Sequence, residues 1–157
     1  MNQWFECKVR FDKTMENGLI KKVTEPYLVE ALTYTEAEAR FLEEIEPFVK
    51  GVEFEVTDIK KARLSEIFFS NDGNDDRWFK ARLAFITLDE KTGSEKRATQ
   101  LVMVQAQDLR IAVKNIDTAM HGTLGDYLIT SVQETNILDV IRYAVDSKDS
   151  EPEFKEA

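Results

Sequence analysis

The feature that most constrains this chain is an internal repeat with a spacing of about 74 residues. Trp4–Phe11 resembles Trp78–Phe85, and Val56–Ile59 resembles Ile129–Val132. Three further pairs of segments follow in the same order: Lys21–Thr24 with Lys96–Thr99, Tyr27–Val29 with Leu101–Met103, and Leu64–Phe69 with Leu138–Tyr143. A fixed period over several segments is the signature of a repeated structural unit. The sequence therefore predicts two copies of one supersecondary unit.

Each copy opens with a pattern that predicts a β-hairpin. Apolar residues alternate with polar ones along Trp4–Phe11 and again along Trp78–Phe85, as in a strand with one buried face. Asn17-Gly18 and Gly93 then supply turn residues. The return strands are predicted at about Leu19–Ala31 and Glu95–Gln105. Pro26 lacks an amide hydrogen and predicts a bulge or a sheet edge in the first copy.

A helix and a third strand follow in each copy. Thr35 and Glu38 form a capping box, and Asp108 is the expected N-cap of the second helix. Apolar residues recur at helical spacing, and two stripes are expected to be buried: Ala37, Phe41, Ile45 and Phe48, then Leu109, Ala112, Val113, Ile116 and Met120. The third strands are predicted at Glu53–Ile59 and Tyr127–Val132. The closing segments, Leu64–Phe69 and Leu138–Tyr143, fit a short strand or a helical turn equally well.

These patterns predict an α+β protein of two tandem β-β-α-β repeats, at about 1–70 and 77–145. A unit of this size with one helix buries too little apolar surface to be stable alone. The two copies are therefore expected to form one pseudo-symmetric domain over residues 1–145, with a shared core, a mostly antiparallel sheet and two main helices. Residues 146–157 read as an acidic, flexible tail.

Several segments together resemble one protein family. They are Trp4–Val9, Lys22–Val29, Tyr34–Arg40, Val56–Ile59, Asp76–Lys80 and Phe85–Lys91. The sequence up to Tyr143 resembles the domain of unknown function 4494 family, which occurs in bacteria of the Bacteroides group and in phage-related genomes. The resemblance implies an intracellular bacterial or phage protein. It carries over no functional residue.

Composition argues against several classes of function. The chain has one cysteine, Cys7, and one histidine, His121, which excludes an intramolecular disulfide and a site with two histidine ligands. Cys7 lies on the apolar face of its strand, where Ala81 replaces it in the second copy, so we expect it to fill space. No apolar stretch approaches the roughly 18 residues of a membrane span, and the first residues lack a signal peptide. We predict a cytoplasmic protein that is no enzyme, holds no cofactor and does not contact a membrane.

One acidic cluster could hold a cation. Asp72, Asp75 and Asp76 surround Gly73 in the segment that joins the two copies. Carboxylates suit calcium or magnesium, but the cluster lacks the spacing of an EF-hand loop. An ordinary aspartate–glycine turn is the preferred interpretation, and the three residues are kept as a weak metal candidate.

The polar faces of the first strands suggest a binding surface. Tryptophan and basic residues share these faces or adjoin them on the return strands: Trp4, Lys8, Arg10 and Lys22 in the first copy, and Trp78, Lys80, Arg82 and Arg97 in the second. Aromatic rings beside cations bind single-stranded nucleic acid in many proteins. The net charge of −9 opposes nonspecific nucleic-acid binding.

The sequence supports three candidate functions, each from a different functional class. The preferred one is a non-catalytic binding or scaffold domain, whose partner is another protein or itself and whose exposed strand edges invite pairing. The alternative is an accessory protein of phage or mobile-element origin that binds single-stranded nucleic acid. A metal-assisted enzyme ranks third.

Overall fold

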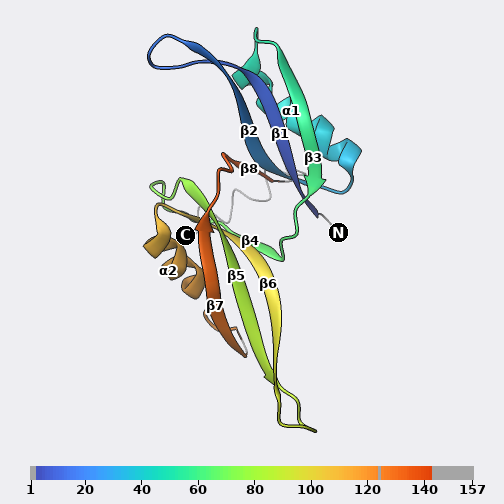
Figure 1. The fold of residues 1–157 in the computed structure, drawn as a ribbon, viewed down its shortest axis with the longest axis vertical. Coiled ribbons are helices and arrows are strands. Elements are labelled where there is room, and N and C mark those ends of the chain that lie inside the picture. The colour runs from blue at the N-terminus through green and yellow to red at the C-terminus, as the bar shows by residue number, and fades with distance from the viewer. Residues whose placement is uncertain (1–2, 124, 143–157) are drawn as a thin grey trace. The chain divides into compact units, whose positions relative to one another are not determined.

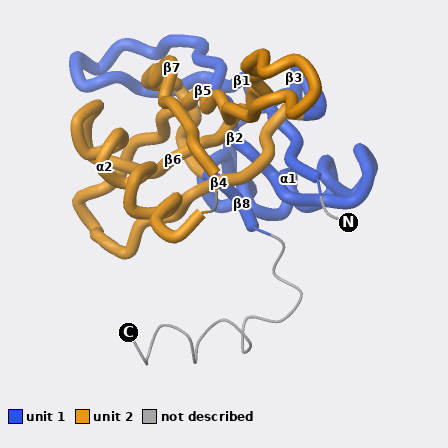
Figure 2. Tube along the Cα trace, turned by 90° about the horizontal axis from the view of Figure 1, so that it is seen from below, with its two compact units in different colours: residues 1–61, 140–157 blue, residues 62–139 orange. Residues whose placement is uncertain are grey.

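The structure is a computed structural model that describes residues 3–123 and 125–142. The chain divides into two compact units (Figure 2). Unit 1 holds residues 1–61 and 140–157, and unit 2 holds residues 62–139. Unit 2 is therefore one continuous stretch of chain, whereas unit 1 is assembled from two stretches.

Unit 1 is a four-stranded sheet with one helix on one face (Figure 1). The strand order is β3-β1-β2-β8. Its elements are β1 (Gln3–Thr14), β2 (Ile20–Ala31), α1 (Tyr34–Val49), β3 (Phe54–Lys61) and β8 (Val140–Ile141). β1 pairs antiparallel with β2 and β3, whereas β8 pairs parallel with β2.

The core of unit 1 lies between β1 and α1. The alternating residues of β1 are buried, together with four residues spaced by one helical turn along α1; these are Phe5, Cys7, Val9 and Phe11, and Ala37, Phe41, Ile45 and Val49. Ile141 of β8 joins this cluster. The period of two in the strand and of about 3.6 in the helix therefore bring the two apolar surfaces together.

Unit 2 has the strand order β4-β6-β5-β7. Its elements are β4 (Glu66–Phe68), β5 (Arg77–Leu88), β6 (Glu95–Ala106), α2 (Leu109–Ala119) and β7 (Asp126–Glu134). β5 pairs antiparallel with β6 and β7, and β4 pairs parallel with β6. Phe79, Ala81 and Leu83 of β5 pack with Ala112 and Ile116 of α2 in a separate core.

The two short strands, β4 and β8, each join a sheet to which the strand before them in sequence does not belong. β4 follows β3 of unit 1 along the chain, yet it pairs with Val102–Val104 of β6 in unit 2. β8 follows β7 of unit 2, yet it pairs with Leu28 and Val29 in unit 1. We call β4 and β8 the closing strands. Each sheet is completed by the closing strand that follows the third strand, β3 or β7, of the other sheet.

The α+β class, the mostly antiparallel pairing and the two helices are confirmed among the described residues. The prediction of one sheet is wrong, because the strands form two sheets that each have their own core. Both closing segments contain a short strand rather than a helical turn, although Tyr143 lies outside the described residues, as does the predicted tail.

Two local predictions for unit 1 need correction. The N-cap of α1 is Thr33, whose hydroxyl accepts from the Glu36 amide at 3.1 Å, so the capping box starts two residues before the predicted Thr35. Phe48 is 75% exposed, because the buried stripe advances in steps of four residues and reaches Val49 instead. Of the two alternatives predicted for Pro26, the sheet edge is the one observed: β1 and β2 pair without a register shift, and on the outer side of β2 the strand β8 pairs only with Leu28 and Val29.

The register shifts instead affect the third strands. β1 and β3 pair Lys8 with Asp58 but Val9 with Val56, so Thr57 is the extra residue. β5 and β7 shift in the same way between Arg82 and Leu83, which leaves Thr130 as the extra residue. Thr130 donates its hydroxyl hydrogen to the carbonyl of Arg82 at 3.1 Å. Both third strands therefore carry a β-bulge.

The closing strands make a testable prediction about stability. Ile141→Asp places a carboxylate in the core of unit 1 and should lower the free energy of unfolding by about 2–4 kcal/mol. Hydrogen exchange should then speed up at the amides of β2. The matched change Ile67→Asp should instead speed up exchange in β6. Faster exchange in β6 after Ile141→Asp would contradict this assignment of the closing strands.

Candidate functional site

In unit 1, the residues of the predicted basic face lie beside carboxylates. Arg10 bonds to Glu55 at 2.8 Å, Lys8 lies 4.0 Å from Glu6, and Lys22 lies 3.7 Å from Asp12. These pairs are largely exposed and contribute little to stability. They do cancel much of the positive charge that a phosphate backbone would need.

The two tryptophans differ in exposure. Trp4 is half-buried, whereas Trp78 is 3% exposed. The Phe69 ring stands edge-on to Trp78, with ring centroids 5.6 Å apart. A base can stack only on an accessible ring face. The burial of Trp78 therefore counts against a stacking surface that needs both rings.

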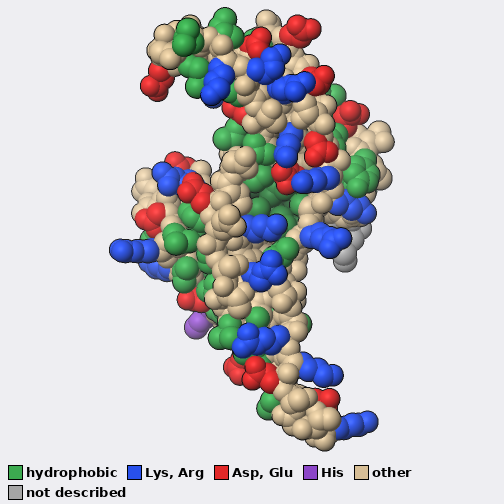
Figure 3. Space-filling view, in the orientation of Figure 1, with side chains coloured by type: hydrophobic (Ala, Val, Ile, Leu, Met, Phe, Trp, Pro, Cys, Tyr) green, Lys and Arg blue, Asp and Glu red, His purple; other side chains and the backbone are tan. Residues whose placement is uncertain are grey.

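In unit 2, two cations of the predicted face are exposed and free of nearby carboxylates. Lys80 and Arg82 alternate with the core residues of β5 and so lie on the sheet face opposite α2. Within residues 3–123 and 125–142, neither forms an ion pair. Arg97 of β6 is paired with Glu95 at 3.5 Å. Figure 3 shows lysine and arginine side chains over the strands of unit 2.

The outer edge of β6 is only partly covered. β4 pairs with Val102–Val104, and the Ser65 amide donates to the Leu101 carbonyl at 2.7 Å. On that side, no described strand pairs with Glu95–Gln100, and all six of these residues are exposed. Figure 1 shows β4 beside only the part of β6 that lies far from the hairpin tip. The sequence pattern predicted exposed strand edges. It did not indicate which edge is open, because β4, the strand that covers part of β6, comes from the segment that follows β3.

The other long edges carry features that hinder pairing with a further strand. Pro26 of β2 lies opposite Lys8 of β1. It holds the position that Leu101 holds in β6, opposite Arg82 of β5. Proline has no amide hydrogen to offer a further strand. β3 and β7 are bulged at Thr57 and Thr130. Such devices are typical of edge strands that avoid pairing with other chains.

The aspartate cluster forms a hydrogen-bonded loop. Asp75 is 5% exposed, and its carboxylate accepts from Ser70 Oγ and from Asn115 Nδ2, the latter at 3.3 Å. Asp72 Oδ1 accepts from the Asn74 amide at 2.9 Å, and Asp76 is exposed. In the described part of the chain, no three His, Cys, Asp or Glu side chains are grouped to hold a metal ion. The loop is thus fastened to α2 by Asp75.

Cys7 is fully buried in the core of unit 1. Burial, and after it the charges of Asp58, Glu6 and Glu38, raises the pKa of its thiol from 9.0 to about 12. The thiolate, which is the reactive form, is therefore scarce near neutral pH. This placement fits a space-filling role for the side chain.

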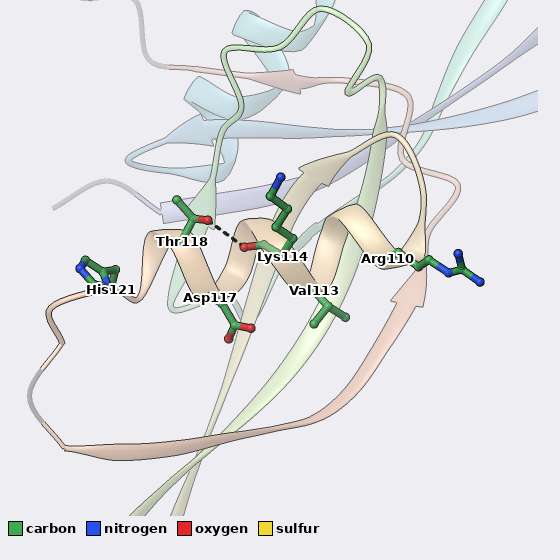
Figure 4. A pocket seen from close by; sticks show the side chains of 6 residues that line it. All are labelled: Arg110, Val113, Lys114, Asp117, Thr118 and His121. Atoms are coloured by element: carbon green, nitrogen blue, oxygen red, sulfur yellow. Dashed lines mark hydrogen bonds between the residues drawn. The ribbon is translucent and has the colours of Figure 1, made fainter.

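His121 follows α2 and lines a shallow pocket of about 610 Å³ on the exposed side of that helix. The other lining residues are Arg110, Val113, Lys114, Asp117 and Thr118. Figure 4 shows that the side chains of Arg110, Lys114 and His121 point in different directions. Asp117 accepts a hydrogen bond from the Tyr127 hydroxyl at 2.8 Å. The pocket has no convergent set of polar groups that would fix a ligand.

No helix in the described part of the chain is long and apolar enough to cross a membrane. Both helices also have a polar face.

Burial of Cys7 predicts a dependence of stability on alkaline pH. The pKa is higher in the folded than in the unfolded chain, so folding favours the neutral thiol. This contribution is complete below pH 9.0 and is lost as the pH rises toward about 12, with a slope of at most about 1.4 kcal/mol per pH unit. Urea unfolding at several pH values should show a smaller decline for Cys7→Ala. Equal declines in both proteins would contradict the prediction.

Removal of the Asp75 carboxylate should loosen the loop. Asp75→Ala removes the acceptor of Ser70 Oγ and one of the two acceptors of Asn115 Nδ2, the other being the Gln105 carbonyl, and should lower the free energy of unfolding by about 1–3 kcal/mol. Asp76→Ala is the matched control and should have little effect, since Asp76 is exposed. Thermal unfolding measures both. An equal effect of the two changes would argue against a special role for Asp75.

Comparison with known proteins adds one finding. No curated protein matches the chain significantly. The family described as Domain of unknown function (DUF4494) matches residues 3–143, which include every described strand and helix. The chain therefore belongs to this family of unknown function.

Proposed function

We propose that this protein is a non-catalytic binding or scaffold domain that engages a protein partner, or a second copy of itself, by strand pairing. The observation that supports the proposal most is the way both sheets are closed. Each accepts a strand of two or three residues on one edge, and no other described strand pairs with the rest of that edge. Addition of a strand to an open edge is a common mode of peptide recognition.

Nucleic-acid binding is the second candidate, and one observation favours it. Lys80 and Arg82 are exposed cations without a carboxylate partner among the described residues. Two cations can contact phosphates. The buried Trp78 offers no stacking partner beside them, so this function ranks second. With this second function, the protein would be an accessory protein of phage or mobile-element origin.

Several finer predictions remain proposals. A duplication that produced tandem β-β-α-β repeats is supported by the order of hairpin, helix and third strand, which both units share, and by bulges at matching positions. Assembly of the units into one pseudo-symmetric domain is a proposal of the same kind. A bacterial or phage origin and a cytoplasmic location rest on the sequence alone.

The two functions can be separated by affinity capture. The full chain should retain a protein partner from host extract after nuclease treatment, and the purified partner should bind the purified chain directly. If there is no partner, concentration-dependent self-association should appear in sedimentation experiments. Capture that disappears with nuclease, combined with salt-sensitive binding to labelled oligonucleotides, would favour the nucleic-acid function. A monomer that binds neither class would overturn both.

A further inference from the structure

We propose that the edge of β2 at Leu28 and Val29 is a docking site for β8 of a second copy of this chain, so that two chains exchange their closing strands. The inference rests on the proposed function and names both the partner and the site. We call these two residues of β2 the acceptor edge. Three observations support it: the closing strands are exchanged between the two halves of the chain, β8 is a short arm, and the paired residues are apolar.

The closing strands are exchanged between the two halves of the chain. β1 to β4 lie in the first half, Gln3–Phe68, and β5 to β8 lie in the second half, Arg77–Ile141. β4 pairs in parallel with β6 of the second half, and β8 pairs in parallel with β2 of the first (Figure 1). Each acceptor strand therefore takes a closing strand from the other half and not from its own.

The two exchanges have the same register. Val29 of β2 and Val104 of β6 are equivalent, because each lies opposite the phenylalanine that follows the tryptophan of its hairpin. Val29 pairs with Ile141 of β8. Val104 pairs with Phe68 of β4. Ile141 and Phe68 both pack against the core of the sheet that they join. Two protomers that swap a strand exchange the same element in the same register. The pairing therefore does not require that donor and acceptor belong to one chain.

β8 is a short arm that follows a segment fastened to unit 2. The strand consists of Val140 and Ile141, and both pair with β2. The amide and the hydroxyl of Thr135 both donate to the Trp78 carbonyl at 2.9 Å, which ties the start of the preceding segment to β5. Because so few residues pair, little structure is lost when β8 leaves the acceptor edge. The arm can then be offered to another chain while unit 2 keeps its own sheet.

The chemistry of the acceptor edge suits this partner. Leu28 and Val29 are buried, as are Val140 and Ile141 opposite them. None of the four side chains is charged, so the net charge of −9 repels a second chain only at longer range, where salt screens it. A second copy carries the same two apolar residues in the same context. An unrelated protein would have to imitate them.

The concentration of the chain decides which donor is used. A strand tethered within its own chain has an effective concentration on the order of 1 mM at its acceptor. A second copy competes equally only when the chains themselves reach about 1 mM, and at about 10 µM about one chain in a hundred exchanges. Exchanged dimers should therefore form when chains fold together at high concentration.

The test uses full chains with Cys7→Ala, which introduces the residue that stands at the equivalent position of β5, Ala81. Leu28 and Val140 lie opposite each other on adjacent strands, within the Cα separation that a disulfide bridges. Chains with Leu28→Cys and chains with Val140→Cys are unfolded in urea, refolded together and oxidised. Disulfide-linked dimers should be at least about tenfold more abundant after refolding at about 1 mM than at about 10 µM.

Two controls keep the result interpretable. Thr87→Cys, an exposed position of β5, replaces Val140→Cys in the first control and should give little linked dimer at either concentration. The second control carries Leu28→Cys and Val140→Cys in one chain. At about 10 µM it should close its disulfide within that chain, because the tethered strand then outcompetes a second copy.

The unchanged chain gives a readout without substitutions. Refolded at about 1 mM, it should contain a dimer in sedimentation experiments, whereas refolding at about 10 µM should give the monomer. Absence of linked dimers at the high concentration, while the double variant closes its disulfide within one chain, would overturn the exchange between copies. The proposed function would stand if that chain still retained a nuclease-resistant protein partner. Failure of the folded double variant to form its disulfide would overturn the acceptor edge itself.

Discussion

A strand at the rim of a sheet has unpaired backbone groups and one uncovered side, and in both units a distant piece of the chain fills part of that space. The closing strands are short, with two and three residues, yet they carry apolar side chains into or against each core. Ile141 is buried with Phe5 and Cys7, and Phe68 packs against the cluster around Phe79. Unit 1 thus depends on a strand that follows unit 2 along the chain, whereas unit 2 contains its own closing strand. Where these two strands end decides which parts of each sheet edge are paired among the described residues.

Much of each unit was predictable from local patterns. Alternation along β1 and β5, the turn glycines, Asp108 as a helix cap and most of each apolar stripe follow from the periods of strands and helices. The prediction that Leu109 belongs to the second stripe is wrong: it is the first residue of α2 and is 51% exposed. Gly18 and Gly93 indeed have positive φ angles of 84° and 73° at the hairpin turns. The limits of this reasoning are equally local. Thr33 rather than Thr35 caps α1, because two hydroxyl residues stand close together and only the geometry of the chain decides between them.

The pairing between distant segments could not be predicted in this way. Val140 and Ile141 form a short apolar segment, and nothing in that segment indicates which strand it pairs with. Parallel pairing with Leu28 and Val29 depends on the path of the chain between units. The candidate site shows the same limit. The eight basic and aromatic residues were recognisable from alternation, but the burial of Trp78 under Phe69 and the pairing of Arg10 with Glu55 depend on neighbours from other elements.

The divided path of unit 1 has a consequence for folding during synthesis. A ribosome completes residues 62–139 as one continuous stretch, so unit 2 can fold as soon as it leaves the exit tunnel. The first hairpin and α1 emerge earlier but wait for Ile141 before their core is complete. At about 5–20 residues per second, that delay lasts on the order of 4–16 s. During this interval the nascent chain exposes the rim of β2, and Pro26 at that rim discourages unwanted pairing with neighbouring nascent chains.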